Sequence, residues 1–269
     1  MSEPSSPASS GVFPAGLHNA FKFAAFNALS FQIVLGSPMI LYAKTLDASA
    51  TVLGIIAGMM PLLVIMQIPA ANYIDRIGYK KFVYGGWGIR VFFIFLMAMV
   101  PLTNVFLNST TQLVLLLALL FAFNLSRGIS SSAWLPWITL LVPPAVRGRY
   151  VASDAGYTQF GSFVTIVVAA ICLGTQPTSW QFAAIFGFSG LMGAASLGFL
   201  KLIPDAPITA QVRTSNTPVP YGAMLKHDAF RRLLWEAFAW AVAYGGMSTF
   251  TVDYLKTEAG TWPSTRRVE

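Results

Sequence analysis

Long stretches without charge alternate with short charged clusters along the chain. Four windows contain no Asp, Glu, Lys or Arg, and they cover residues 23–43, 48–74, 91–126 and 155–200. A helix needs about 20 mostly apolar residues to cross a bilayer, and each window reaches that length. A soluble domain of this size has no need for 46 consecutive uncharged residues. The pattern therefore predicts a protein that crosses the membrane several times.

Proline, glycine and polar clusters divide these windows into seven predicted helices. The longest window divides at GTQPTSW (174–180), and another divides at LTNVFLNSTTQ (102–112), because such residues favour turns. The predicted helices are 20–43, 51–73, 82–103, 112–139, 155–175, 181–203 and 233–252. The expected fold is an all-α membrane protein, a polytopic bundle of about seven transmembrane helices.

Composition supports the membrane interpretation and narrows the chemistry. The chain is 55% hydrophobic and has a mean hydropathy of +0.64. Its net charge of +7 comes from short cationic clusters between apolar windows, which favours loop charges that orient a membrane protein over a nucleic-acid surface. The single cysteine, Cys172, allows no disulfide within the chain. No phosphate-binding glycine loop or His/Cys cluster is present in the sequence, so we expect no cofactor and no metal.

Cations gather in every second predicted loop. The loops after helices two, four and six hold ten Lys and Arg residues, whereas the loops after helices one, three and five hold only Lys44. Because positive loops remain cytoplasmic, we expect a multi-pass protein of the plasma (inner) membrane with a cytoplasmic N-terminus. The expected divisions are a disordered tail at 1–19, a six-helix body at 20–203, a cytoplasmic linker at 204–232, the seventh helix at 233–252 and a tail at 253–269.

The most highly charged loop, AANYIDRIGYKKF (70–82), has a distinctive spacing. Its defined positions are Ala71, Asp75, Arg76, Gly78, Lys80 and Lys81. The loop resembles the signature of the major facilitator superfamily, G-x-x-x-D-R/K-x-G-x-R/K-R/K, which joins the second and third helices on the cytoplasmic side. Five of the six positions match, and Ala replaces the first Gly. A small residue lets helices approach closely, glycine permits a tight turn, and the lysines suit anionic head groups.

A second charged segment resembles another part of the same superfamily. LVPPAVRGRY (141–150) is similar to the Pro-then-Arg-Gly-Arg loop after the fourth helix, and it contains Arg147, Gly148 and Arg149. Either arginine is a candidate to pair with Asp75 across the cytoplasmic face. The alternative is that both are only orienting charges.

The resemblance implies a secondary transporter that moves a small solute by alternating access. Such proteins usually have twelve spans in two six-helix halves, each built from three-helix inverted repeats, with the solute site near the midplane. Here the first half and one helix of the second are recognisable, so we expect an incomplete single chain, a truncated product. A natural half that works as a homodimer is the alternative. The expected partners are the lipid bilayer, the solute, a coupling ion if transport is coupled, and a second half or second copy.

Charged and amide side chains inside the predicted helices are the site candidates, because their insertion is costly. Arg127 lies near the middle of the fourth helix, and Asn124 shares its face. We expect Arg127 to bind an anionic or polar group of the solute or to take part in coupling. The alternative is pairing with neighbouring carbonyls. Further cavity candidates are Asn27, Gln32, Trp134, Tyr157, Gln159 and Glu236. For Asn27 and Gln32 the alternative is hydrogen bonding between helices. For Trp134, Tyr157 and Gln159 it is packing or a position at the membrane interface.

Other polar residues are given different expectations. Arg90 is expected to form a supporting ion pair or to extend toward the cytoplasm. Asp47, Asp75, Asp154 and Asp205 are expected at or beyond helix ends, which leaves no proton site at mid-depth in the first six helices.

Two other functions compete with transport. GFSGL (187–191) resembles the Gly-x-Ser-Gly motif of rhomboid-type intramembrane proteases, but the serine needs a base, and both histidines, His18 and His227, fall in predicted soluble segments. Ser189 and Gly190 are better explained by close helix packing, so we expect no enzyme activity. A non-transporting membrane subunit or assembly factor is the other alternative, and a buried Arg127 argues against it.

Overall fold

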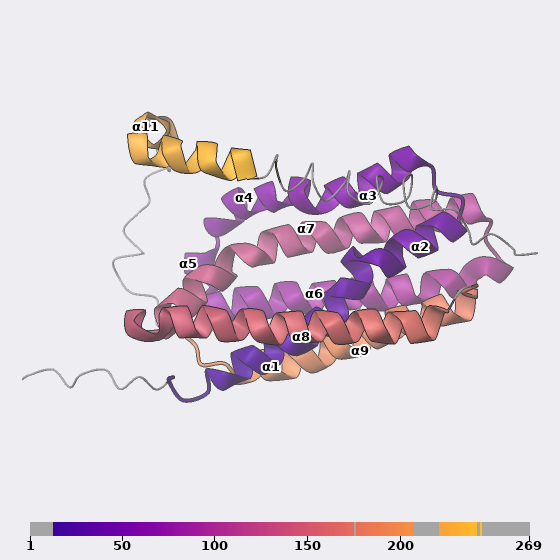
Figure 1. Cartoon of the computed structure of the whole chain (residues 1–269), viewed down its shortest axis with the longest axis horizontal. Coiled ribbons are helices and arrows are strands. Elements are labelled where there is room, and N and C mark those ends of the chain that lie inside the picture. The colour runs from indigo at the N-terminus through magenta and orange to yellow at the C-terminus, as the bar shows by residue number, and fades with distance from the viewer. Residues whose placement is uncertain (1–12, 175, 207–220, 241–242, 244–269) are drawn as a thin grey trace, which may run out of the picture. The chain divides into compact units, whose positions relative to one another are not determined.

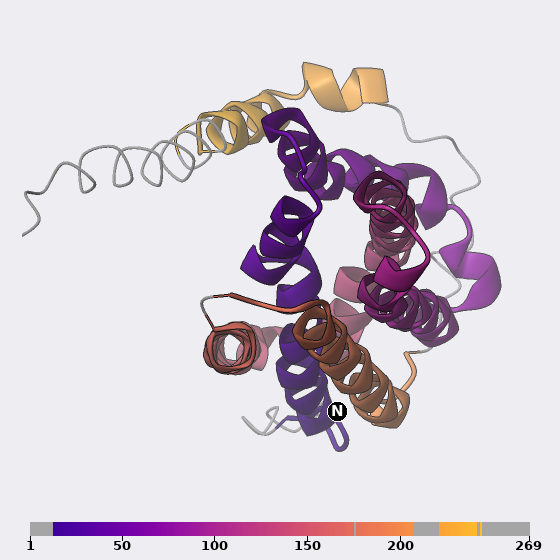
Figure 2. The same cartoon turned by 90° about the vertical axis from the view of Figure 1, so that its right-hand side faces the viewer.

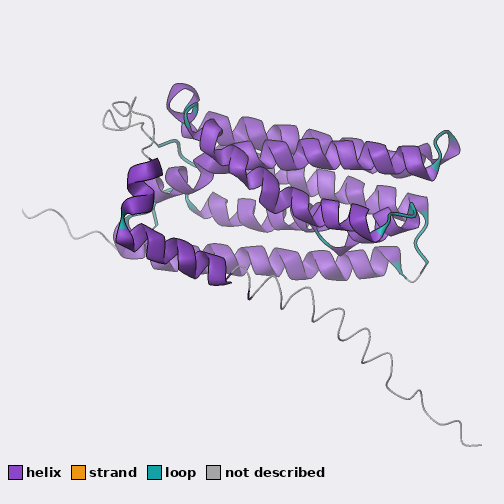
Figure 3. Ribbon diagram, turned by 90° about the horizontal axis from the view of Figure 1, so that it is seen from above, coloured by secondary structure: helices purple, strands orange, loops and turns teal. Residues whose placement is uncertain are grey.

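The computed structural model describes residues 13–174, 176–206, 221–240 and 243 (Figure 1). The chain divides into two compact units, Met1–Arg213 and Thr214–Glu269. Every regular element in the described residues is helical, without a strand among them (Figure 3). The all-α expectation is confirmed.

Six helical segments of the described residues are long and apolar enough to cross a membrane. They are His18–Thr45, Ala50–Ala71, Tyr79–Val105, Ser109–Leu141, Pro144–Leu173 and Ser179–Leu202. Each overlaps one of the first six predicted helices. The predicted seventh helix is helical at 233–240 and 243, and its other positions lie outside the described residues. The second unit also contains the short helix α11 (Tyr221–Lys226).

The first span is broken into two helices. α1 (His18–Leu35) and α2 (Ser37–Thr45) meet at Gly36, whose backbone is extended (φ −105°, ψ −161°). Pro38 in the first turn of α2 has no N–H to donate backward. A Cβ at Gly36 would lie 2.3 Å from the carbonyl oxygen of Gln32. The sequence here therefore favours a break, and a single continuous helix over 20–43 is not what forms.

The second and third spans contain shorter interruptions. The second consists of α3 (Ala50–Leu63), η1 (Val64–Met66) and α4 (Gln67–Ala71), and Pro61 precedes the change to the tighter 3₁₀ geometry. After α5 (Ile74–Ile77), Gly78 has φ 90° and ψ 146°, a conformation that favours glycine. The third span is α6 (Tyr79–Met99) followed by η2 (Val100–Val105).

The last three spans of this unit are α7 (Ser109–Leu141), α8 (Arg147–Leu173) with η3 (Pro144–Val146) before it, and α9 (Ser179–Leu202). The predicted start of the fifth helix, residue 155, is eight residues too late. Pro144 occupies the first position of η3, where its fixed φ and missing N–H suit a helix start. At the other end, Gly174 has φ 57°, and Thr178 and Gln181 form a capping box on α9.

The helices of the first unit interleave rather than follow their order in the chain. α1 packs against α8 and α9, α6 packs against α7 and α9, and α3 and α4 pack against α7. Figure 2, which looks roughly along the helix axes, shows α1 and α2 crossing the bundle, with α6 and α7 on one side. Spans that are far apart in the sequence therefore build a common interior.

Two apolar clusters fill this interior, with a polar layer between them. At the start of α1, Ala20, Phe21 and Phe23 belong to one cluster, and further along it Ile33 and Val34 belong to the other. The same division recurs along α6, α7 and α9. In the layer between them, the Ser189 hydroxyl donates to the Ser30 carbonyl at 2.7 Å. This layer contains most of the buried polar side chains and the cavity described next.

Candidate functional site

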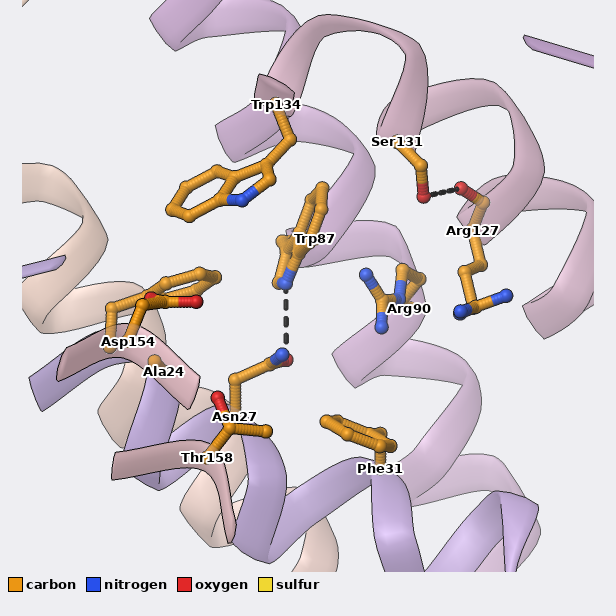
Figure 4. A pocket seen from close by; sticks show the side chains of 11 residues that line it. Ala24, Asn27, Phe31, Trp87, Arg90, Arg127, Ser131, Trp134, Asp154 and Thr158 are labelled. Atoms are coloured by element: carbon orange, nitrogen blue, oxygen red, sulfur yellow. Dashed lines mark hydrogen bonds between the residues drawn. The ribbon is translucent and has the colours of Figure 1, made fainter. Parts of the chain in front are cut away.

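A cavity of about 220 Å³ opens in the polar layer between α1, α6, α7 and α8 (Figure 4). Its lining residues are Phe23, Ala24, Asn27, Phe31, Trp87, Arg90, Arg127, Ser131, Trp134, Asp154 and Thr158. Arg90 lies 11 residues after the start of α6, which is about 16 Å along the helix at a rise of roughly 1.5 Å per residue. Counted from the start of α6, this distance is about half of the roughly 30 Å thickness of a hydrocarbon core.

An indole and an amide fix one wall of the cavity. Trp87 Nε1 donates a hydrogen bond to Asn27 Oδ1 at 3.1 Å, which joins α6 to α1. With its oxygen used in this way, Asn27 keeps its Nδ2 hydrogens for other acceptors. Figure 4 shows this bond crossing the centre of the site. Asn27 is therefore both a structural link and a possible donor at the cavity surface.

Arg90 is almost completely buried, with an exposed fraction of 4%. Its guanidinium carbon lies 4.3 Å from the centre of the Trp87 ring and 5.4 Å from that of Phe123. Such cation–π contacts stabilise a desolvated guanidinium by about 2 kcal/mol or more, and Nε is buried without a hydrogen-bond partner. Within the described residues Arg90 forms no ion pair, and its side chain is buried inside the bundle rather than extended to either end of it. The prediction for Arg90 is therefore wrong, since the side chain lines the cavity instead.

Arg127 enters the cavity from α7. Its backbone carbonyl accepts hydrogen bonds from the hydroxyls of Ser130 and Ser131. No hydrogen bond or salt bridge joins its guanidinium to another described residue, and the side chain is half-buried. Pairing with neighbouring carbonyls, the structural alternative for this arginine, is not observed in this part of the chain.

Asp154 faces the same cavity from α8. It lies inside the helix, seven residues after Arg147, about 10 Å from its start at a rise of 1.5 Å per residue. The expectation that Asp154 sits at or beyond a helix end is therefore wrong, because α8 begins earlier than predicted. Its Oδ1 is buried without a hydrogen-bond partner. Thr158, one turn further along α8, also lines the cavity.

The remaining cavity candidates lie elsewhere. Gln32 Nε2 donates to Ser162 Oγ at 2.9 Å, which links α1 to α8. Asn124 is buried and donates to the Leu120 carbonyl in its own helix. Tyr157 is 48% exposed and stacks on Phe21, with ring centres 5.4 Å apart. Two further candidates are exposed and do not line this cavity: Gln159 on α8 and Glu236 in the second unit.

The signature-loop residues form a separate cationic end of the bundle. Ala71 ends α4, Asp75 and Arg76 lie in α5, and Lys80 and Lys81 begin α6 after Gly78. Lys80 Nζ donates to the Ile203 carbonyl at 2.7 Å, directly after the end of α9. The C-terminal end of α9 is the negative end of its helix dipole, so the Lys80 ammonium group is favourable there. Lys80 therefore joins the signature loop to the last span of this unit.

The second charged segment is helical rather than a loop. Arg147, Gly148 and Arg149 make up the first turn of α8. Arg147 Nη2 donates to the Thr139 carbonyl at 3.3 Å, and the Arg149 guanidinium lies 5.3 Å from the Phe13 ring centre. Pairing of either arginine with Asp75 stays a prediction.

The serine of the protease-like motif is part of the helix packing. Ser189 is fully buried and hydrogen-bonds to the hydroxyl and the carbonyl of Ser30. A Cβ on Gly190 would meet the Phe95 ring at 2.8 Å, so this glycine permits close contact between α9 and α6.

The charged groups of the cavity do not neutralise one another. The lining holds two guanidinium groups and one carboxylate, and no salt bridge joins them in the described residues. In Figure 4 the two guanidinium groups lie on one side of Trp87 and the Asp154 carboxylate lies on the other. Groups of three or more His, Cys, Asp or Glu residues that would suit a metal are absent from the described part of the chain. The arrangement suits binding of a polar or charged solute.

Comparison with known proteins gives one match. The family model described as Major Facilitator Superfamily matches residues 22–261. No curated protein and no solved structure matches the chain significantly.

Proposed function

This chain belongs to the Major Facilitator Superfamily, and we propose that it moves a small solute across the membrane by alternating access. The solute site in this proposal is the cavity between α1, α6, α7 and α8. Transporters of this kind bind near the midplane of the bilayer, between helices that rock as rigid groups. The depth of the cavity and the helices that line it agree with such a site.

One observation carries the proposal. The Arg127 guanidinium lines the cavity and forms no hydrogen bond or salt bridge with a described residue. A charged side chain at this depth costs a few kcal/mol to insert, and no bond within the described residues offsets that cost. A bound solute supplies the missing acceptor. A purely structural membrane subunit has no use for an arginine kept in this state.

The experiment is solute counterflow into proteoliposomes that contain the full chain. A panel of radiolabelled small anions, cations and neutral solutes is tested with the wild type, Arg127→Ala and the control Arg232→Ala. Arg232 is exposed within the helical residues 228–240 of the second unit, and it is not among the residues that line the cavity. We expect at least one panel member to exchange faster than in empty liposomes. The loss of charge-assisted hydrogen bonds in Arg127→Ala then lowers its apparent affinity by about 10- to 100-fold.

The control decides how a loss is interpreted. Arg232→Ala should exchange the same solute at the wild-type rate. If Arg127→Ala also exchanges every active solute at that rate, the cavity is not the solute site. If no solute of any charge exchanges, the transport proposal itself fails.

We also infer that the N-terminus and the signature loop face the cytoplasm of the cell, with the protein in the plasma membrane. The inference rests on the cations that gather at one end of the bundle, because positive loops remain cytoplasmic. At this end Lys80 bonds the Ile203 carbonyl, and Arg147 and Arg149 lie in the first turn of α8. In a Cys172→Ser background, we expect Lys201→Cys to react with an impermeant maleimide only after permeabilisation. Lys44→Cys, which is exposed at the end of α2, should react in intact cells. The reverse labelling pattern would show that the signature loop faces the outside of the cell.

A further inference from the structure

We propose that the cavity selects a small organic monocarboxylate with a flat or apolar body, bound with its carboxylate against Arg127. This inference rests on the proposed transport function and names the chemical class of the solute. It depends on three features of the lining: an excess of one positive charge, the Arg127 guanidinium, which has no partner among the described residues, and aromatic walls.

The charge balance favours an anion. Arg90 and Arg127 are both positive, because guanidinium groups stay protonated in proteins, and Asp154 is the only carboxylate in the lining. The lining charge is thus 2 − 1 = +1 when the aspartate is ionised. A monoanion brings the occupied cavity to neutrality, whereas a cation would raise its charge to +2 and a dianion would reverse its sign. Since unpaired charge is costly at this depth, the monoanion is favoured.

The two arginines contribute in different ways. Arg127 is half-buried, and its guanidinium has no partner among the described residues, so it can offer two parallel N–H groups to a carboxylate. Arg90 also lines the cavity, but it is held against Trp87 and Phe123 and is only 4% exposed. Its unpartnered Nε shows that its hydrogen-bonding capacity is not exhausted by the protein. We therefore assign the direct contact to Arg127, and Arg90 adds to the positive potential as a positioning residue.

The uncharged part of the lining is aromatic. Trp87 and Trp134 lie with their ring centres 6.0 Å apart, and Phe23 lies 5.0 Å from Trp134. Phe31 lines the cavity from α1, near Asn27 (Figure 4). Such walls bind flat or apolar bodies through burial and ring contacts. The volume of about 220 Å³ is below the roughly 300–1,000 Å³ typical of pockets for drug-sized ligands, so the body must be small.

Asp154 makes the site discriminate between anions. Its carboxylate lies across Trp87 from the two guanidinium groups, and one of its oxygens is buried without a hydrogen-bond partner. A second negative charge on the ligand would meet this carboxylate. Asp154→Asn removes the repulsion while it retains the shape of the side chain. The structure thus predicts that this variant binds monocarboxylates more tightly and accepts dicarboxylates.

The test uses four ligands that share a ring and differ in charge. Benzoate is the monoanion, benzamide its neutral counterpart, benzylamine the cation and phthalate the dianion. Protection of the full chain in nanodiscs against thermal unfolding is titrated for each ligand, with the wild type, Arg127→Gln and Asp154→Asn. We expect benzoate to bind at least about 10-fold more tightly than benzamide, because a hydrogen bond to a charged group exceeds a neutral one by about 1.4 kcal/mol or more. Benzylamine and phthalate should be weaker still.

The variants should change selectivity in opposite directions. Arg127→Gln should make benzoate and benzamide equivalent, and Asp154→Asn should tighten phthalate by about 10-fold or more relative to the wild type. If benzoate protects the wild type no better than benzamide does, or if neither protects it, the proposed class is wrong. Preference for benzylamine would also overturn it. In either case exchange of a neutral or cationic solute in the counterflow assay would leave the transport function standing.

Discussion

Replacing Gly128 by alanine tests whether the contact between α7 and α3 sets the position of Arg127. A Cβ at residue 128 would lie 2.1 Å from the Leu63 carbonyl oxygen, 3.0 Å from its carbon and 3.5 Å from Met66 Cβ. Ordinary contact begins near 3.4 Å, so the helices must separate by 3.4 − 2.1 = 1.3 Å. The obstacle is backbone at the end of α3, which cannot rotate aside as a flexible side chain can.

The expected change in the free energy of unfolding for Gly128→Ala follows from two opposing effects. Overpacking in a well-packed interior costs about 1–3 kcal/mol, whereas alanine is favoured over glycine inside a helix by about 0.5–1 kcal/mol. Because the obstacle is backbone, the upper part of the overpacking range, about 2–3 kcal/mol, applies, and the net loss of stability for Gly128→Ala is about 1–2.5 kcal/mol. Gly156→Ala is the matched control, because Gly156 lies inside α8 with nothing within 4 Å of an added Cβ. This control should be more stable than the wild type by about 0.5–1 kcal/mol.

The assay is reversible unfolding in mixed micelles with increasing SDS, followed by helical circular dichroism. The free energies of unfolding of the two variants should differ by about 2 kcal/mol, with opposite signs relative to the wild type. Equal stability of Gly128→Ala and Gly156→Ala would refute the close approach of α7 to α3. Because residue 127 is adjacent, Gly128→Ala should also weaken benzoate protection, whereas Gly156→Ala should leave it unchanged.

Three further substitutions have defined outcomes in the same unfolding assay. Lys80→Met removes the bond to the Ile203 carbonyl and should lower the free energy of unfolding by about 1 kcal/mol, whereas Lys81→Met, its neighbour, should change it little. Gly78→Ala forces a side chain onto a residue with φ 90° and should cost at least about 1–2 kcal/mol; an unchanged stability would contradict the turn. Arg90→Met removes a buried charge whose Nε has no hydrogen-bond partner. The free energy of unfolding should therefore stay equal or rise, while benzoate binding weakens. Strong destabilisation would show that Arg90 is structural.

The spans and the signature turn were predictable because their signals are local. Charge-free windows longer than the bilayer requires identify the six spans, and the glycine at 78 adopts the positive φ that a tight turn needs. The packing role of Ser189 and Gly190 was also predictable, because small residues let membrane helices approach. These inferences depend on residue type and spacing alone.

The cavity lining was only partly predictable, because it depends on where helices begin and how they rotate. The sequence places Asp154 at a helix end because the uncharged window begins only at residue 155, although Pro144 is a signal for an earlier start. The position of Arg90 in the cavity could not be predicted, because the sequence does not show that Trp87 and Phe123 enclose its guanidinium. Gln32 meets its partner Ser162 across 130 residues, a pairing set by tertiary packing. Local patterns carry no information on such pairs.

The interleaving of the spans has a consequence for biogenesis. α1 leaves the ribosome first, yet its main packing partners are α8 and α9, the last spans of this unit. Ser30 must wait for Ser189, 159 residues later in the chain. At about 5–20 residues per second, that interval is roughly 8–32 seconds. During this interval Ser30 and Gln32 lack their partners on α9 and α8, so α1 can reach its final packing only after the last spans of this unit have been made.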